Sequence, residues 1–320
     1  MFRAVSILIF MTLQILPAGI QAAEGDTIPS GYKRVWSDEF TSLSLRTGGP
    51  TYDGLETGSG TWSAPGAFYS SDPRGVAGYG FDWFVDPFYD RWPAGYPAQG
   101  QFKITHEGLR IRAERPSSAM AAILPAIARE GGGTPWISGQ VTSFHAVRIK
   151  PPFYFEARAK MPVGIGRPWP AIWLLTGAHR HPGDSGKEYE IDLHEGFGDD
   201  DRLHSAIHWN PRADKPEYPS SEVANMPSGV ILSGGFNTWA CKVTKGLQIV
   251  FFNGKEIGRL ETPNTANADQ FYGMILDVSA GLPWMNGLRN DGGAPSGGPH
   301  DMIVRYVRLY APDTNGLRLR

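Results

Sequence analysis

Short runs in which apolar and polar residues alternate dominate the chain after its first thirty or so positions. Alternation with a period of two is typical of strands that bury one face. The pattern predicts strands at residues 34–36, 102–105, 109–113, 140–143, 153–160, 171–175, 189–194, 205–209, 239–244, 248–252, 272–277 and 302–310. Asn253-Gly254, between the apolar runs 249–252 and 256–260, predicts a two-residue hairpin turn.

Only one segment favours a helix. Residues 117–129 are rich in alanine and are followed by three glycines, although Pro125 opposes a continuous helix. Residues 282–299 form a Gly/Pro-rich loop of unusual length. Many strands with almost no helix predict an all-β sandwich, and the absence of a linker or repeat predicts a single domain over residues 24–320.

Composition narrows the class of function. The 320 residues carry a formal net charge of -2, which gives no basic footprint for nucleic acid. Aromatic residues make up 12% of the chain, and this count alone favours core packing over stacking on a ligand. Cys241 is the only cysteine, so no intrachain disulfide can form. Its apolar neighbours predict a buried, unreactive thiol.

The first 23 residues resemble a signal peptide. Arg3 supplies a positive start, residues 6–16 are apolar, and Ala22 and Ala23 offer small side chains for cleavage. The apolar run is too short to cross a bilayer. We therefore expect a secreted protein, extracellular or periplasmic, with no membrane partner.

Residues 188–195 carry four acids in eight positions, at 188, 190, 192 and 195. Side chains alternate faces along a strand, so the apolar residues at 189, 191 and 193 should face the core and the first three acids should face the other way. Glu195 lies five residues after Glu190 and breaks this parity. A bulge of one residue, around Leu193 and His194, would return Glu195 to the acidic face.

Such a row of acids suits glycoside hydrolysis. Glu190 and Glu195 would have Cα atoms about 13 Å apart along the strand, and leaning side chains would bring their carboxyls to about 5–5.5 Å, the spacing of a retaining glycosidase. One glutamate would attack the sugar while the other donates a proton, and Asp192 between them would assist. Spacing alone leaves open an acidic, solvent-facing edge strand.

The stretch Glu190-Ile191-Asp192-Leu193-His194-Glu195 resembles the bulged catalytic signature of glycoside hydrolase family 16. This family includes laminarinases, lichenases, agarases and bacterial exopolysaccharide glycanases. Further segments resemble family segments and run in family order over nearly the whole mature chain, at residues 35–40, 155–162, 169–175, 207–209, 251–254 and 304–310.

This resemblance implies a β-jelly roll with a sugar cleft across its concave sheet. It implies Glu190 as nucleophile, Glu195 as general acid/base and Asp192 as the assisting acid, while Glu188 matches no catalytic position. The expected activity is endo-acting cleavage of a β-1,3-glucan, a mixed β-1,3-1,4-glucan or a bacterial exopolysaccharide, with net retention. We expect a monomer without a catalytic cofactor, acting on a polysaccharide.

The resemblance also implies substrate contacts. The expected residues are Trp169, Trp173, His208, Asp82, Trp83 and Arg158. Trp173 has a second interpretation, packing beneath the cleft, and His208 can equally be a hydrogen-bonded core histidine. His194, at the predicted bulge, can face either side of the sheet.

Two departures from the family pattern limit what carries over. Arg305 stands where relatives often have an aspartate that helps to bind a structural calcium, so calcium is doubtful here. Asp277-Val278-Ser279-Ala280-Gly281 stands where relatives often have Asn-Leu-Ala-x-Gly-Gly, so the cleft wall differs and the substrate cannot be transferred.

Three rival functions remain at this stage. A non-catalytic sugar-binding module on the same fold is disfavoured because both glutamates are present. A transglycosylase would use the same residues as a hydrolase. A zinc enzyme could use His204 and His208, but their four-residue spacing suits a helix and not a strand.

Overall fold

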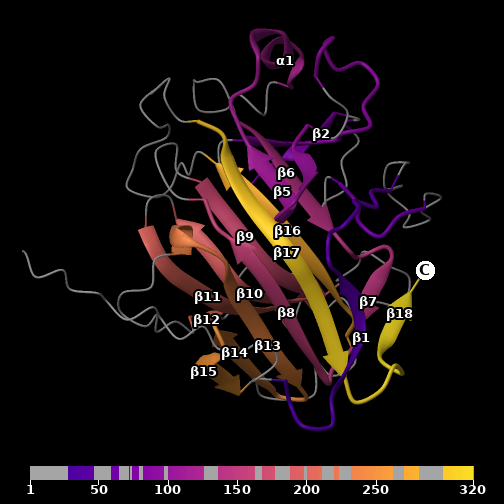
Figure 1. Cartoon of the computed structure of the whole chain (residues 1–320), viewed down its shortest axis with the longest axis vertical. Helices are drawn as coiled ribbons and strands as arrows, with labels where there is room; N and C mark the ends of the chain where they lie inside the picture. Colours follow the sequence, from indigo (N-terminus) through magenta and orange to yellow (C-terminus); the bar gives the residue numbers. More distant parts are fainter. Residues whose placement is uncertain are drawn as a thin grey trace, which may run out of the picture.

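Two β-sheets packed face to face form the protein in the computed structural model (Figure 1). Strands pair antiparallel throughout the described residues except between β3 and β6. The structure describes residues 28–46, 59–64, 72, 74–78, 82–96, 100–125, 136–162, 168–176, 188–197, 200–210, 220–222, 232–261, 270–280 and 298–319.

The first sheet has eight strands in the order β15-β14-β13-β8-β17-β5-β4, with β1 paired to β17. The long strand β17 lies at its centre, between β8 and β5. Its strands are β1 (Lys33–Asp38), β4 (Phe102–Thr105), β5 (Gly108–Ala113), β8 (Phe153–Lys160), β13 (Asn237–Thr244), β14 (Leu247–Phe252), β15 (Lys255–Glu261) and β17 (His300–Ala311).

The second sheet has ten strands, in the order β12-β11-β10-β9-β16-β6-β3-β2, with β7 paired to β16 and β18. It carries the acidic stretch on β10. Its strands are β2 (Gly75–Ala77), β3 (Asp82–Val85), β6 (Trp136–Thr142), β7 (Val147–Ile149), β9 (Pro168–Thr176), β10 (Glu188–Phe197), β11 (Asp200–Asn210), β12 (Ser220–Glu222), β16 (Tyr272–Ala280) and β18 (Leu317–Leu319).

The hydrophobic core lies between the two sheets. Alternate residues of β8 supply it from one side, with Phe153, Phe155 and Ala157 fully buried. From the other side, β10 contributes Tyr189 and Ile191 to the same cluster. Burying such side chains contributes roughly 1.5–3 kcal/mol each. The period-two pattern that predicts the strands therefore also assigns one face of each sheet to the core, and leaves the other face of β10 for its acids.

The predicted helix is confirmed but is shorter than expected. Helix α1 spans Ser118–Ile123, and the Ser117 hydroxyl accepts a hydrogen bond from the Met120 amide at 3.2 Å. Its C-cap, Leu124, already has extended backbone, because the proline that follows at position 125 restricts the residue before it. A short 3₁₀ helix covers Leu232–Gly234. The hairpin prediction is confirmed too, since Asn253 and Gly254 join β14 to β15 with φ of 46° and 78°.

Several sequence predictions fall outside the described residues. These are the signal peptide over residues 1–23, residues 126–129 of the helix segment and residues 282–297 of the long loop. Within the part of the chain that the structure describes, no helix is long and apolar enough to cross a membrane.

Candidate active site

A β-bulge interrupts β10 at the place where the alternation of side chains predicts one, between Asp192 and Glu195. On the β9 side, Asp192 pairs with Trp173 and the next pair is His194 with Ile172, so the register shifts between Asp192 and His194. On the β11 side, the register shifts between Asp192 and Glu195. The extra residue therefore lies at Leu193–His194, and the predicted bulge is confirmed.

The bulge sends two consecutive side chains toward the interior. Leu193 joins the main core, and His194 is 1% exposed with its ring centroid 5.3 Å from that of Trp239, on the opposite sheet. Burial lowers the pKa of His194 to about 3, so the ring is neutral under working conditions. His194 therefore fills space beneath the strand as a buried, neutral ring.

Glu190, Asp192 and Glu195 of β10 face away from the core, on what we call the acidic face of the ten-stranded sheet. This face is the side opposite the buried residues Ile191 and Ile207. Three transverse rows cross it. Glu190 pairs with Leu175 on β9 and His208 on β11, Asp192 with Trp173 and Ala206, and Glu195 with Ala171 and His204.

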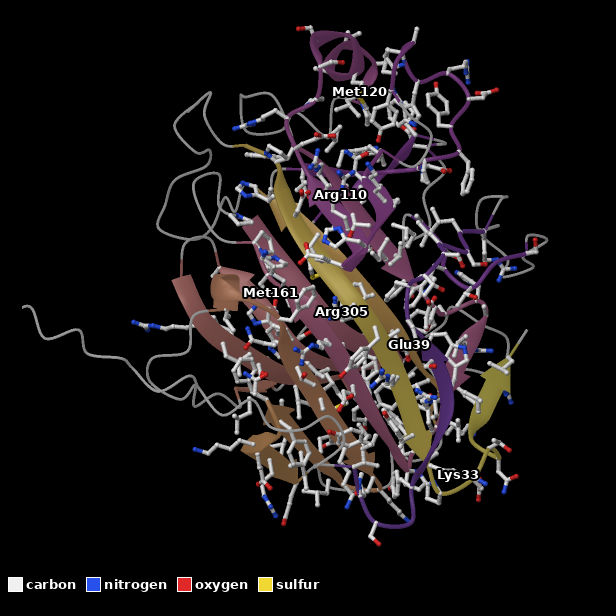
Figure 2. The ribbon with its side chains drawn as sticks, viewed as in Figure 1. Lys33, Glu39, Arg110, Met120, Met161 and Arg305 are labelled. Atoms are coloured by element: carbon white, nitrogen blue, oxygen red, sulfur yellow. The ribbon has the colours of Figure 1, made fainter. Side chains whose placement is uncertain are left out.

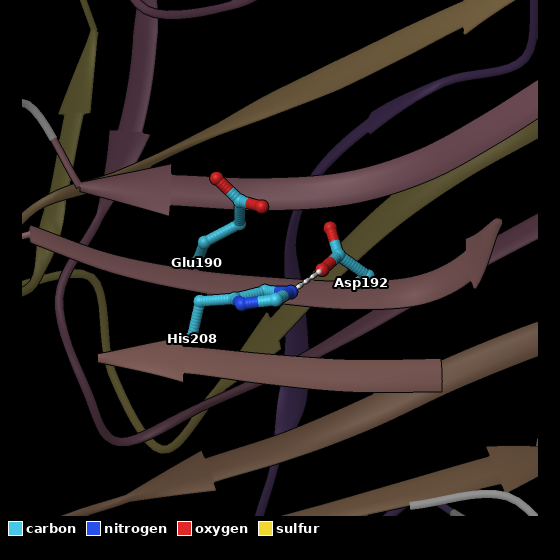
Figure 3. Close-up of side chains that lie close together, drawn as sticks. All are labelled: Glu190, Asp192 and His208. Atoms are coloured by element: carbon cyan, nitrogen blue, oxygen red, sulfur yellow. Dashed lines mark ion pairs between the residues drawn. The ribbon is translucent and has the colours of Figure 1, made fainter. Parts of the chain in front are cut away.

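Asp192 lies at the centre of the acidic face and is 3% exposed. Its Oδ2 lies 3.2 Å from Nε2 of His208, which reaches it from the neighbouring strand (Figure 3). Burial raises the pKa of Asp192 well above its usual range, and the negative charges of Glu195 and Asp277 raise it further. His208 thus occupies a position beside the acids, which distinguishes it from an ordinary core histidine.

Glu190, Asp192 and His208 each place one donor atom within 4.8 Å of the other two. The spacing would suit a cation, but acidic groups of this kind are common without one.

Two tryptophans of β9 flank the acids with their indole N–H groups. Trp169 Nε1 donates to Oε1 of Glu195 at 3.2 Å, and its half-buried ring also lies 6.0 Å from the ring of Phe197. Trp173 is 5% exposed, and its Nε1 donates to Oδ1 of Asp277 at 2.7 Å. The structure therefore places Trp173 in the floor of the acidic face, as the second interpretation of this residue expects.

Two further carboxyls lie buried on the same sheet. Asp277 of β16 is 1% exposed, and burial, with the charges of Asp82 and Glu195, raises its pKa well above the usual range. Asp82 of β3 is 3% exposed, and its Oδ1 accepts a hydrogen bond from the Ser279 hydroxyl at 2.9 Å. The sequence analysis names Asp277 only as part of a cleft wall that differs from that of relatives. The alternation of side chains along β16 nevertheless puts Asp277 on the acidic face.

The structure does not bring Trp83 or Arg158 to the acidic face. Trp83 is 2% exposed among Val85, Met120 and other apolar side chains under α1, and its indole donates to the Arg74 carbonyl at 3.2 Å. Arg158 lies on β8, in the other sheet, with its guanidinium 6.0 Å from the Phe236 ring. The predicted substrate contact at Arg158 is wrong. Its two neighbours in β8 face the core, so the Arg158 side chain faces the other side of the eight-stranded sheet.

Arg305 itself cannot supply a ligand to a calcium ion. Its guanidinium lies 4.9 Å from the Phe236 ring centroid and donates to the Glu107 carbonyl at 3.4 Å (Figure 2 labels Arg305, which lies on β17). A guanidinium carries five donors and no acceptor, so it cannot supply an oxygen ligand. His204 pairs with Glu195 and His208 with Glu190, so the two histidines lie four residues, about 13 Å, apart along β11, too far to share one zinc ion.

The protein is a β-jelly-roll sandwich in which one bulged strand of the ten-stranded sheet presents acids on the face that points away from the core. Solved glycoside hydrolases share this fold over most of both chains. One is a non-specific endo-β-1,3(4)-glucanase of glycoside hydrolase family 16, with TM-score 0.58, 21% identity, and coverage of 89% of this chain and 93% of the other. Another is the catalytic domain of an endo-1,3-β-glucanase from Thermotoga petrophila, with TM-score 0.58, 20% identity, and coverage of 88% and 98%.

A third structure comes from work on endo-acting O-glycanases with which human gut bacteria initiate mucin breakdown. It has TM-score 0.56, 21% identity, and coverage of 90% of this chain and 93% of the other. No protein-family model matches the chain, and no curated protein matches it either. At these identities the likeness establishes the fold, and function must be argued from the site.

Proposed function

We propose that this protein is a secreted, endo-acting β-glycanase of glycoside hydrolase family 16 that works by retaining double displacement. The observation that carries the proposal is the bulge at Leu193–His194, which turns Glu195 to the same face as Glu190 and Asp192. An acidic edge strand would need no such bulge. Moreover, β10 is an interior strand, paired with β9 and β11 on its two sides.

The reaction uses two carboxyls in sequence. In the first step the Glu190 carboxylate attacks the anomeric carbon, the bond to the leaving oxygen breaks, and Glu195 gives its proton to that oxygen. A glycosyl ester on Glu190 results. In the second step Glu195, now ionised, takes a proton from water, whose oxygen attacks the anomeric carbon and releases Glu190. Two inversions at the same carbon give net retention.

The neighbouring side chains support these roles. The Trp169 indole donates to Glu195 and fixes the carboxyl that must face the leaving oxygen. Asp192, with His208 beside it, lies between the two glutamates along the strand and stabilises the charge that returns to the Glu190 carboxylate in the second step. A site whose groups are already held in place stabilises a transition state without reorganisation.

The proposed substrate is a β-1,3-glucan, a mixed β-1,3-1,4-glucan or a bacterial exopolysaccharide. The solved glucanases of the same fold favour the first two, while the mucin-related structure shows that the fold also occurs where the target is a different glycan. A panel of purified polysaccharides that includes mucin glycans identifies the substrate. The products also separate hydrolysis from transglycosylation, which would yield longer chains.

Replacing the nucleophile tests the proposal. Glu190→Gln should lower kcat on the best substrate by on the order of a thousandfold or more, because the amide cannot attack, while folding and glycan binding persist. Glu256→Gln is the matched control. Glu256 is exposed on β15, so this substitution removes the same charge far from the acids of β10. Near wild-type turnover in Glu190→Gln, or a product of inverted configuration by NMR, would contradict the mechanism.

A further inference from the structure

Glu195 and Asp277 face one another across a single small residue. Ala171 of β9 pairs with Glu195 of β10 on one side and with Asp277 of β16 on the other. Two strand spacings put the Cα atoms of the two acids about 10 Å apart, well within the reach of two carboxyl side chains that lean inward. In the strand between them, the residue in this row is Ala171, whose side chain is a single methyl group.

Both carboxyls are held by matching indole groups. Trp169 and Trp173 lie two residues before and two residues after Ala171, so they share its face of the sheet. Trp169 donates to Glu195 at 3.2 Å and Trp173 donates to Asp277 at 2.7 Å. The tryptophans therefore fix one carboxyl on each side of the methyl group.

The surroundings oppose a second negative charge at this place. Asp277 is 1% exposed, and of its neighbours Gln140 on β6 donates a hydrogen bond while Asp82 on β3 adds negative charge. Asp192 lies beside the pair on β10. The histidines that face these acids in the described residues are His204, opposite Glu195, and His208, at Asp192. Burial outweighs the hydrogen bonds from Trp173 and Gln140 and leaves the pKa of Asp277 raised.

We infer that Asp277 is a positioning residue for the proton of Glu195, acting through its carboxyl across Ala171. Two close carboxyls in a low-dielectric site cannot both ionise freely, so the pair retains one proton to a higher pH than a lone glutamate would. Because the two carboxyls share that proton, it is available to Glu195, which must donate it to the leaving oxygen. The inference rests on the proposed function and adds a residue on a neighbouring strand that sets the pH range of the first step.

Asp277→Asn tests this directly. The amide has nearly the same shape, its oxygen can still accept from Trp173, and the change removes a buried acid, so the variant should fold. Without the second carboxyl, Glu195 loses its proton more readily. The alkaline limb of kcat/KM on the best polysaccharide should therefore move down by about one pH unit, which makes the variant about tenfold slower above that limb.

Two further variants keep the test decisive. Asp277→Ala also removes the carboxyl and should move the alkaline limb in the same direction, even though it loses the contact with Trp173. Glu256→Gln removes the same charge from the exposed strand β15 and should leave the limb in place. An aryl β-glycoside with a good leaving group needs no proton, so its alkaline limb should be much less sensitive to Asp277→Asn.

The outcomes separate the two levels of inference. If the wild-type protein cleaves its substrate, Glu190→Gln is inactive, and folded Asp277→Asn keeps the wild-type alkaline limb, then Asp277 has no role in holding the proton and this inference alone fails. If Glu190→Gln retains activity, the proposed mechanism fails. A downward shift in both Asp277 variants, with none in Glu256→Gln, supports the positioning role.

Discussion

At the scale of single residues, the acidic face is a place where folding and chemistry conflict. Asp192 is almost completely buried next to two other acids, and its pKa lies well above the usual range because water is excluded and neighbouring charges are negative. A stable fold by itself would not favour a carboxyl there. The proposed function accounts for a carboxyl at this position, because there Asp192, beside His208, modulates the nucleophile.

Asp192→Asn should therefore stabilise the fold and impair catalysis. A raised folded-state pKa means that the stability contributed by Asp192 is complete below its unfolded pKa and is lost as pH rises through the folded pKa. The asparagine avoids this loss, so the unfolding free energy should rise by about 1 kcal/mol at neutral pH and the gain should shrink in acid. We expect kcat/KM to fall by about a hundredfold.

Urea unfolding at several pH values, with kinetics on the same preparations, measures both effects. A variant that is less stable than wild type at neutral pH but equal to it in acid would contradict the account of Asp192. Glu256→Gln again serves as the control, because its carboxyl is exposed and its change should not produce this pH-dependent gain.

At the scale of elements, the long alternating strands are predictable and the short ones are not. The strands β4 and β8 have the predicted bounds, Phe102–Thr105 and Phe153–Lys160. The three-residue strands β2, β7, β12 and β18 escape prediction. A run of three residues is too short to show a period, so its conformation depends on the neighbour with which it pairs.

The β14–β15 hairpin is an element that local chemistry explains fully. Asn253 and Gly254 both have positive φ, as a type I′ turn requires. The side-chain oxygen of Asn253, Oδ1, also accepts a hydrogen bond from the Thr238 backbone amide at 2.8 Å. Gly254→Ala should lower the unfolding free energy by about 1 kcal/mol, since a Cβ is disfavoured at φ of 78°.

The matched control for this hairpin is Gly235→Ala. Gly235 has ordinary φ, and a Cβ there meets nothing within 4 Å, so stability should be nearly unchanged. Differential scanning calorimetry of both variants checks the expectation. Activity should be retained in both, because the turn belongs to the eight-stranded sheet. Equal melting temperatures for the two variants would show that the turn geometry contributes little.

At the scale of the whole molecule, stability comes from the core between the sheets. Cys241 is fully buried, and burial raises the pKa of its thiol well above the usual range, so the expected unreactive thiol fits its position. Large aromatic side chains such as Trp239 and Phe252 fill the same core. A chain of this size with a single cysteine thus holds its fold without a disulfide between its strands.

Export and redox behaviour can be tested together. The exported protein should have the mass of the chain without about its first 23 residues, as the signal-peptide pattern predicts. Its melting temperature should be the same with and without a reductant, because no disulfide can form within the chain. An uncleaved N-terminus would contradict the first expectation, and a reductant-dependent melting temperature would contradict the second.

The sequence by itself determined the all-β class, most long strands, the bulge and the three acids that it aligns, because each follows from the two-residue period of a strand. It could not determine which strands become neighbours. Only the tertiary structure removed Arg158 from the site, enclosed Trp83 under α1, and set Asp277 opposite Glu195 across Ala171. Pairing between distant strands depends on how both sheets bury their apolar faces together, and that is a property of the whole chain.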